Sequence, residues 1–292
     1  MVKHGKLKSF NAVDWTIMVF FGVLVAFEIL PFINVMSLSV SDNYAVIENP
    51  AMILPNFSHV SFASYVSIFR SEAMYTSFLI SLAVVVCSTG IHVIVTLLAG
   101  FSLSNHNLPG RNAMLLFILF TMLFGGGLVP TYLVISSYNM VDTFWVLVIP
   151  GAISGYNIIL MKNFIINIPD SLIEAAEIDG ANPMYILWKI IAPLCIPIVA
   201  VIALMFAVGK WNDWMTGYLY IKKERWLWPF QNVLQNLVVN TDSNNSTGMD
   251  LSTFGESFKN ALIMISLLPV ILMYLVSQKY LIKGIFVGSV KG

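Results

Sequence analysis

The chain has 292 residues, of which 58% are hydrophobic and only 10% charged, and its mean hydropathy is +0.82. Soluble domains average about 25% charged residues, so this composition excludes a soluble globular protein and indicates an integral membrane protein. The formal net charge is zero, which gives no electrostatic case for nucleic-acid binding. Cys87 and Cys195 are isolated in or beside apolar stretches, and they provide neither a disulfide framework nor a metal site.

Six long apolar stretches predict an all-α integral membrane protein with six transmembrane helices. A span needs about 20 apolar residues to cross roughly 30 Å of hydrocarbon. The stretches cover residues 15–40, 78–101, 113–135, 143–166, 194–220 and 260–282. The expected organisation is one six-span domain, residues 15–282, between short tails at residues 1–14 and 283–292.

Basic residues predict the orientation. Lys3, Lys6 and Lys8 precede the first span, and the first helix usually dominates orientation by keeping positive charge on the cytoplasmic side. With six spans, both termini and the loop between the fourth and fifth spans are therefore expected in the cytoplasm. The first apolar run is too long for a cleavable signal and lacks a small-residue cleavage site.

Two ionisable residues lie within the early spans. Glu28 in the first span and His92 in the second have either a packing role, neutral or hydrogen-bonded, or a role in a pathway. We favour packing for both. Between these spans, Phe62–Phe69 predicts a short amphipathic helix, which lies either at the membrane interface or against the surface of the protein.

Three glycines interrupt the third span. Gly125, Gly126 and Gly127 are followed closely by Pro130. Such a run permits close contact between helices, or it forms an unwound segment lining a cavity, as transporters often have at their sites. Both interpretations stay open on the sequence.

A polar stretch between two long apolar runs covers residues 168–197, which we call the coupling segment. Ser171 and Glu174 have the spacing of a capping box at the start of a helix. That helix is expected to run from Leu172 to Asp179, and Gly180 stands where a left-handed cap would end it.

A second short helix is expected to follow. Asn182 is its candidate N-cap, with Pro183 at the first helical position, and it should reach about Ala192 and end at Pro193. Small residues at 175, 176 and 180 permit close approach of a partner backbone. On local chemistry alone, the segment is either a docking element or a helical hairpin packed on its own protein.

The spacing Glu174-Ala175-Ala176, then Gly180, Ile190 and Ala192-Pro193, resembles the EAA loop of bacterial ATP-binding-cassette (ABC) importer permeases. The family usually has leucine where this chain has Ala192. The resemblance implies the type I ABC importer permease fold and a coupling helix that docks in a cleft of an ATPase subunit. The coupling residues that it implies are Glu174, Ala175, Ala176, Asp179, Gly180, Ala181 and Pro193.

Other stretches resemble the carbohydrate branch of this family. They are Pro31–Ser39 and the Gly-Gly-x-x-Pro pattern with Thr131-Tyr132, which resembles a subgroup associated with complex oligosaccharides. Trp211-Asn212 is similar to sugar importers and, with the glycines at 125–127, implies lining of the translocation path. Trp211 and Trp214 also fit an aromatic belt at the membrane interface, which we favour.

Two further segments resemble partner-binding parts of related permeases. Lys222–Glu256 is expected to be an extracellular loop with a flexible tip at Thr241–Gly248. In relatives, a loop here reaches into the sugar cleft of a binding protein, although a tip without a partner explains it equally well. The tail Ser289, Val290, Lys291 and Gly292 resembles one that enters the ATPase dimer interface, or it is a frayed terminus.

The resemblance implies a complex in the bacterial cell (plasma) membrane. Its parts would be a second, different permease chain, two ATPase subunits and an extracytoplasmic sugar-binding protein. The chain has no GxxxxGK[ST] phosphate loop, so ATP and Mg²⁺ are expected on the partner subunits and no cofactor or metal on this chain. No nucleophile motif indicates an enzyme. An ion-coupled secondary transporter using Glu28 and His92 is the alternative function.

Overall fold

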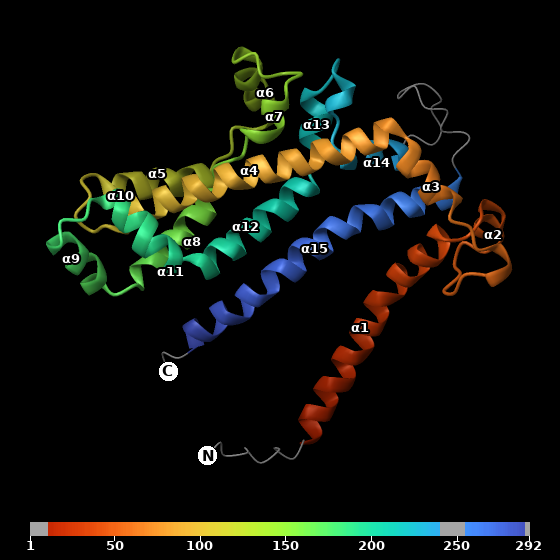
Figure 1. The fold of residues 1–292 in the computed structure, drawn as a ribbon, viewed down its shortest axis with the longest axis horizontal. Coiled ribbons are helices and arrows are strands. Elements are labelled where there is room, and N and C mark those ends of the chain that lie inside the picture. The colour runs from red at the N-terminus through yellow and green to blue at the C-terminus, as the bar shows by residue number, and fades with distance from the viewer. Residues whose placement is uncertain (1–10, 240–254, 290–292) are drawn as a thin grey trace. The chain divides into compact units, whose positions relative to one another are not determined.

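The computed structural model describes residues 11–239 and 255–289, and all the regular elements in those ranges are helices (Figure 1). One isolated bridge joins Ser41 to Val60. The predicted all-α class is confirmed for this part of the chain. The composition explains it, because a backbone in hydrocarbon must satisfy its own N–H and C=O groups, and helices do so within one segment.

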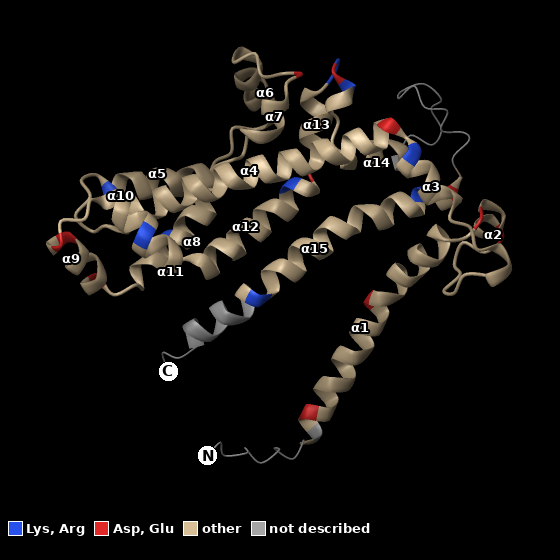
Figure 2. Cartoon of the chain, viewed as in Figure 1, with Lys and Arg blue, Asp and Glu red and all other residues tan. Residues whose placement is uncertain are grey.

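Single helices of membrane-spanning length occur three times in the described residues. They are Val13–Ser39 within α1 (Ala12–Ser39), α4 (Glu72–Ser104) and Glu256–Tyr280 within α15 (Glu256–Ser289). These helices are largely free of charge, and most charged residues lie near helix ends or in loops (Figure 2). Glu28 is an exception, exposed part-way along α1.

Bent helix pairs supply two further candidate spans. α5 (Arg111–Leu123) and α6 (Leu128–Ser137) meet at 115°, and the helical run Pro183–Leu194 meets α12 (Ile196–Trp211) at 79°. The stretch expected to form a fourth span is divided between α7 (Phe144–Val148) and α8 (Gly155–Ile166). The described helices thus give up to five spans by length and composition, and the count of six stays a prediction.

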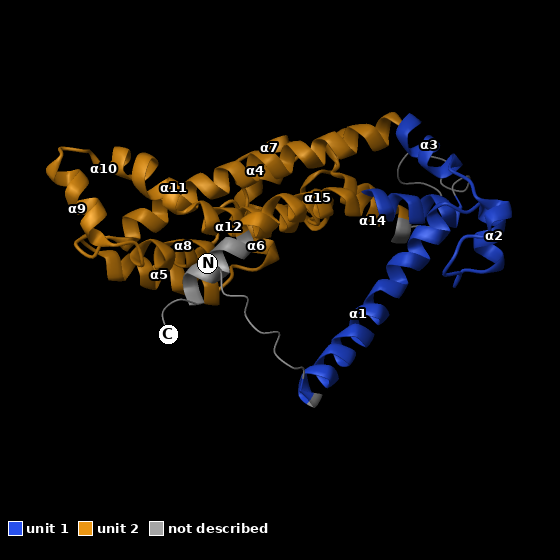
Figure 3. Cartoon of the chain, turned by 60° about the horizontal axis from the view of Figure 1, so that its bottom comes forward, with its two compact units in different colours: residues 1–70, 240–265 blue, residues 71–239, 266–292 orange. Residues whose placement is uncertain are grey.

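The chain divides into two compact units (Figure 3). Unit 1 comprises residues 1–70 and 240–265, and unit 2 comprises residues 71–239 and 266–292. The remaining short elements are α2 (Asn43–Glu48), η1 (Phe57–His59) and α3 (Ala63–Arg70) in unit 1, and α9 (Asp170–Ile178), α10 (Pro183–Tyr185), η2 (Ile186–Ile191), α11 (Ala192–Leu194), α13 (Met215–Tyr220), η3 (Arg225–Leu227) and α14 (Phe230–Val239) in unit 2.

Unit 1 contains the predicted short helix before the second span. It is α3, whose Tyr65 hydroxyl donates to Ser39 Oγ at 2.8 Å. Ser64 Oγ lies 3.1 Å from Ser257 Oγ of α15, and Ile68 is buried. One face of the helix therefore packs on its own protein, as the second of the two interpretations requires.

Unit 2 is built on α4, with α8 and α12 packed along it (Figure 1). α8 approaches α4 closely at Gly100, where an added Cβ would lie 2.5 Å from Met161 Cγ and 3.2 Å from the Lys162 amide nitrogen. Met161 is fully buried there. Glycine is required at this position by space, because any side chain would meet the buried Met161 and the backbone of α8.

The expected outer loop from Lys222 is partly folded, so the prediction of a long loop is wrong for residues 225–239. These form η3 and α14, and Phe230 is buried with its amide donating to Ser81 Oγ of α4 at 2.7 Å. Burial of large apolar side chains such as Leu227 and Phe230 favours packing over a solvated loop. The predicted tip, Thr241–Gly248, lies outside the described residues.

Asp142 ties the connection after α6 to the connection after α13. Its carboxylate Oδ1 accepts hydrogen bonds from the amides of Lys222 at 2.6 Å and Lys223 at 2.8 Å, and its own amide donates to Tyr220 O at 3.0 Å. Burial alone would raise the pKa of Asp142, but the amides of Lys223, Lys222 and Glu224 outweigh it, and the pKa is lowered from the ordinary 3.8.

We expect the stability of unit 2 to fall at low pH through Asp142. A carboxyl with a lowered pKa in the folded state stabilises fully above its unfolded pKa, and this contribution is lost as pH falls through the folded value. Thermal unfolding in detergent should show a steeper fall in stability as the pH drops below about 5 for the native chain than for Asp142→Asn, which cannot ionise. Equal pH slopes would contradict this role.

We expect Gly100→Leu to disrupt the contact between α4 and α8. Overpacking costs about 1–3 kcal/mol, so the folded yield in the membrane and the unfolding temperature should both fall. Gly90→Leu is the matched control on the same helix, because no atom lies within 4 Å of a Cβ added there. Similar behaviour of the two variants in a detergent unfolding assay would count against the close contact.

Candidate functional site

The first helix of the coupling segment starts earlier than expected. α9 begins at Asp170, with Pro169 as N-cap and Leu172 N donating to Pro169 O at 3.1 Å. Ser171 is therefore inside the helix, and the predicted capping box with Glu174 is wrong. Pro169 has φ −58°, and as the residue before the helix it leaves Asp170 in the first turn, where a carboxylate favours the positive end of the helix dipole.

The predicted left-handed cap at the end of α9 is confirmed. Gly180 has φ +79°, its amide donates to Glu177 O at 3.0 Å, and the Ala181 amide donates to Ala176 O at 2.9 Å. These two bonds form a Schellman motif. Nothing lies within 4 Å of a Cβ added at Gly180, so its backbone angle and not a lack of space favours glycine there.

The second helix begins as expected and ends differently. Asn182 Oδ1 accepts from the Tyr185 amide at 2.8 Å, with Pro183 in the first turn. The helical path then continues through a π turn, η2, and through Pro193 to the break at Cys195. The expectation that Pro193 ends it is wrong. A π turn widens the helix just before Pro193, where the ring would otherwise clash with the carbonyl four residues earlier.

One face of the coupling segment packs on its own unit. Ala176, Ile186 and Leu187 are buried in a cluster with Met161 and Ile165 of α8. Ala181 is partly buried against the same cluster. The interpretation of the segment as a packed hairpin is thus correct for this face, which includes Ala176, and the coupling role of Ala176 stays a prediction.

The opposite face of the segment is exposed. Ile178 is 86% exposed, and the apolar residues Leu172, Met184, Tyr185 and Trp188 are also exposed. Glu174, Ala175, Asp179 and Gly180 lie exposed on the same short helix and its cap, and α9 carries acidic residues (Figure 2). Exposed apolar side chains bordered by polar ones are typical of a protein interaction surface.

Residues 149–154 form the second feature of the site, an irregular segment between α7 and α8. A break in a helix frees backbone carbonyls that must find other donors. Lys210 Nζ donates to Leu147 O and Pro150 O, each at 3.2 Å, and His92 Nδ1 bonds to Ala152 O at 2.6 Å. Polar side chains of α4 and α12 therefore stabilise the irregular segment by bonding to its free carbonyls.

His92 has a packing role, as expected. Its Nε2 lies 2.8 Å from Asn157 Nδ2, and its ring stacks on Phe206 with centroids 3.9 Å apart and planes 5° apart. With Nδ1 on Ala152 O, both ring nitrogens are occupied by buried partners. The imidazole is fixed between α4, α8 and α12, which is the geometry of a structural residue and not of a proton relay.

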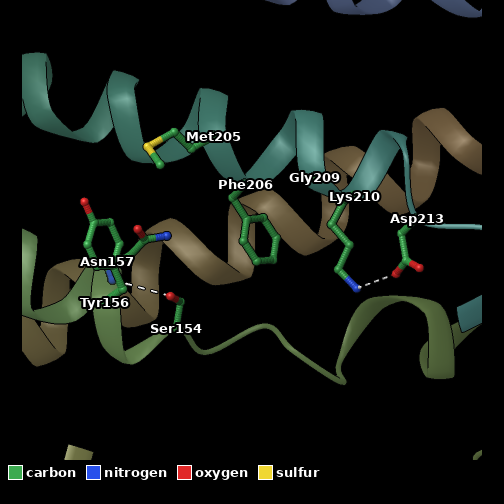
Figure 4. Close-up of a pocket in the computed structure, with 8 residues that line it drawn as sticks. All are labelled: Ser154, Tyr156, Asn157, Met205, Phe206, Gly209, Lys210 and Asp213. Carbon is green, nitrogen blue, oxygen red and sulfur yellow. Dashed lines mark hydrogen bonds and ion pairs between the residues drawn. The ribbon is translucent and has the colours of Figure 1, made fainter. Parts of the chain in front are cut away.

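A pocket of about 350 Å³ lies beside the break, between α8 and α12 (Figure 4). Ser154, Tyr156 and Asn157 line it from α8 and its N-cap, and Phe206, Lys210 and Asp213 line it from the side of α12. Lys210 Nζ is 3.8 Å from Asp213 Oδ2. The sequence analysis did not select these residues. Lys210 and Asp213, two opposite charges three positions apart at the end of an apolar run, were the available signal.

The three glycines predicted to line a path lie in the bend between α5 and α6. An unwound segment at Gly125, Gly126 and Gly127 is confirmed by the bend between α5 and α6. No atom lies within 4 Å of a Cβ added at Gly125 or Gly126, so close packing within the chain is not their purpose. That they line a path stays a prediction.

Trp211 and Asn212 differ in environment. Trp211 is 1% exposed, donates from Nε1 to Ser266 O at 2.9 Å and packs against Phe78 and Phe230. Its assignment to an interfacial belt is therefore wrong, because it is a core residue of unit 2. Asn212 is exposed, with Nδ2 donating to Val208 O at 3.0 Å.

The remaining predicted residues lie at the ends of elements. Pro193 is exposed in α11. Ser289 is the last residue of α15, and the tail residues Val290, Lys291 and Gly292 lie outside the described residues.

The helices of membrane-spanning length and the polar pocket between α8 and α12 are consistent with a membrane transport protein. Residues 93–287 match the family of binding-protein-dependent transport system inner membrane components, and because the match covers more than half of the chain, the chain belongs to this family. The resemblance to ABC importer permeases is thereby confirmed, and membership makes the chain an integral membrane component of a transport system.

Two relatives from Bacillus subtilis (strain 168) match over nearly the whole chain. The polygalacturonan/rhamnogalacturonan transport system permease protein YtcP is 37% identical, over 94% of this chain and 98% of its own length. Protein LplC is 34% identical, over 98% and 97%. Among solved structures, a bacterial ABC transporter involved in the import of the acidic polysaccharide alginate matches with a TM-score of 0.84 and 29% identity, over 94% of this chain and 100% of that one.

We expect His92→Phe to destabilise the irregular segment, residues 149–154, between α7 and α8. The stack on Phe206 would remain, but Ala152 O and Asn157 would lose a buried partner, at a cost of about 1–3 kcal/mol. Thermal unfolding measures this, with the exposed His106→Phe as control. Adding Asn157→Leu to His92→Phe should restore part of the lost stability, since removing both partners leaves fewer buried polar groups unpaired. Strict additivity would contradict the pairing.

Proposed function

We propose that this chain is one permease subunit of an ATP-driven importer of sugars, of the class of oligosaccharides or polysaccharide fragments. The observation that carries the proposal is the exposed apolar and acidic face of α9 on a hairpin fixed to the span-forming helices. Family membership supports the transport role. The names of the relatives, which concern polygalacturonan, rhamnogalacturonan and alginate, support the substrate class.

The proposed complex has four kinds of part. Two copies of an ATPase bind ATP and Mg²⁺, and this chain pairs with a second, different permease. A binding protein delivers the sugar from outside, which the family description supports. The termini and the coupling segment face the cytoplasm, so that α9 docks on the ATPase. The chain itself carries out no catalysis and needs no cofactor.

The mechanism is alternating access driven by closure of the ATPase dimer. For this to work, α9 must move with the ATPase as a rigid body and transmit that movement to the spans. The Schellman cap at Gly180, the Asn182 cap and the buried Ala176 and Ile186 make the hairpin rigid. The acidic residues of α9 would meet a basic rim on the ATPase, and Ile178 would fill an apolar cleft.

An ion-coupled secondary transporter is the competing function, and it would need His92 or Glu28 as a relay. The pairing of both His92 nitrogens in a buried network disfavours that role. Uptake that is abolished by collapse of the ion gradient and indifferent to ATP would favour the secondary transporter.

We expect the tagged native chain, extracted in a gentle detergent from its own membrane, to co-purify with an ATPase and a second permease chain. Glu174→Lys should lose the ATPase, because it places a cation where the proposed partner is basic. The charge-matched control is Glu72→Lys at the exposed start of α4, which should retain both partners. Recovery of the native chain without an ATPase, under conditions that preserve other complexes, would overturn the proposal.

We expect Gly180→Val to uncouple ATP hydrolysis from uptake in the reconstituted complex. A β-branched residue at φ +79° is strained by about 1–2 kcal/mol, so the cap should open and uptake per ATP hydrolysed should fall by about tenfold or more. Gly180→Asn is the matched control, because asparagine tolerates the left-handed conformation. Normal uptake per ATP in Gly180→Val would remove the rigid hairpin from the mechanism.

A further inference from the structure

The pocket between α8 and α12 lies near the depth of the membrane midplane. α8 has 12 residues and is therefore about 18 Å long, and its C-terminal end leads into the coupling segment, which the proposed function assigns to water. Half of the hydrocarbon layer is about 15 Å thick. Ser154 and Tyr156, at the start of α8, thus lie close to the middle of the bilayer, where transporters commonly hold their substrates.

The composition of the pocket excludes a lipid-facing position. Irregular backbone such as residues 149–154 is tolerated at membrane depth only where it is buried in protein or lines a water-filled cavity. The pocket beside it carries two hydroxyl groups, an amide and an ion pair, which are all costly in contact with hydrocarbon. The open side of the pocket therefore faces water or the pathway.

The charged groups of the pocket are already engaged. Lys210 Nζ bonds to two carbonyls of the break and pairs with Asp213. The Asp213 carboxylate also accepts from the Thr216 amide at 3.0 Å and from Thr216 Oγ1 at 2.6 Å. Lys210 and Asp213 thus form an ion pair within the chain, and the charge of each is largely neutralised before a ligand binds.

Uncharged groups remain for recognition. Tyr156 is 54% exposed and supplies a hydroxyl and an aromatic face. Ser154 Oγ accepts from the Asn157 amide at 3.4 Å, which leaves its own O–H to donate. Phe206 is covered on one face by His92 and also lines the pocket. Hydroxyl donors beside aromatic rings complement the hydroxyl groups and C–H faces of a sugar ring.

We propose that this pocket is a saccharide subsite of the translocation path, in which Tyr156 and Ser154 contact the hydroxyl groups and ring faces of the sugar. The subsite does not distinguish acidic from neutral sugars. This inference rests on the proposed function and assigns substrate contacts to this chain. The volume of about 350 Å³ is at the lower end of the roughly 300–1,000 Å³ of small-molecule pockets, so the subsite holds a short part of a saccharide chain.

The first test is protection of introduced thiols in the assembled complex. Ser154→Cys and Tyr156→Cys, made in a Cys87→Ser background because Cys87 is exposed and Cys195 buried, should react with a water-soluble maleimide. An oligogalacturonide mixture, which is acidic, and an arabino-oligosaccharide mixture, which is neutral, should each slow the reaction by about fivefold or more. Tyr138→Cys, at a tyrosine that is 74% exposed outside the pocket, should react without protection.

The second test is uptake by the reconstituted complex. Tyr156→Ala should lower the maximal rate by about tenfold and Tyr156→Phe by less, because phenylalanine keeps the ring and loses only the hydroxyl. Tyr138→Ala is the control and should behave as the native chain. Lys210→Gln should lower stability without changing the ratio of acidic to neutral saccharide imported.

The outcomes separate this subsite from the proposed function. Unreactive thiols, or reactive thiols that neither saccharide protects while the native complex imports them, would overturn the subsite and leave the importer intact. Selective loss of the acidic saccharide in Lys210→Gln would overturn the claim that charge is not read here. Assembly with the ATPase but no import of either saccharide by the native complex would instead contradict the proposed substrate class.

Discussion

The pairing of freed backbone carbonyls is the constraint on which unit 2 depends. An apolar stretch long enough to form one span is divided into α7 and α8, and the carbonyls of Leu147, Pro150 and Ala152 are left without helical partners. Hydrocarbon supplies no hydrogen-bond donors, so side chains must supply them. Lys210 and His92 do this from two other helices. The break, the two polar residues and the neighbouring pocket are therefore one structural feature.

The same rule shapes the coupling segment at the other end of α8 and α12. The carbonyls at the end of α9 are satisfied by the Schellman bonds at Gly180, and the next helix begins with the side-chain cap of Asn182. From there, the helical path leads to the break at Cys195, and α12 then covers about 21 Å between Ile196 and Lys210, which pairs with Asp213. Two helical segments that meet at the break at Cys195 thus connect the exposed face of α9 to the pocket, and the proposed alternating access would use this connection.

Local rules on the sequence predicted the helical class and the caps at Gly180 and Asn182, but they missed the start of α9 at Asp170. The left-handed Gly180 and the Asn182 cap depend on neighbours in the sequence, so their spacing was sufficient. The position of Trp211 depends on Phe78 and Ser266, distant in the sequence, and it was mistaken for an interfacial residue. The division of the fourth span was also missed, because hydropathy records how apolar a stretch is and not whether its backbone is continuous.

Charge has two separate purposes in this chain, and environment distinguishes them. Within the spans, Lys210 and Asp213 are turned toward each other and toward backbone groups, since an unpaired charge at that depth would be costly. On α9, the carboxylates of Glu174 and its neighbours are exposed, where they cost little, and in the proposed complex they would attract a basic partner. A substitution that removes an internal charge should therefore act through folding, whereas one on α9 should act through association, and the two effects can be measured independently.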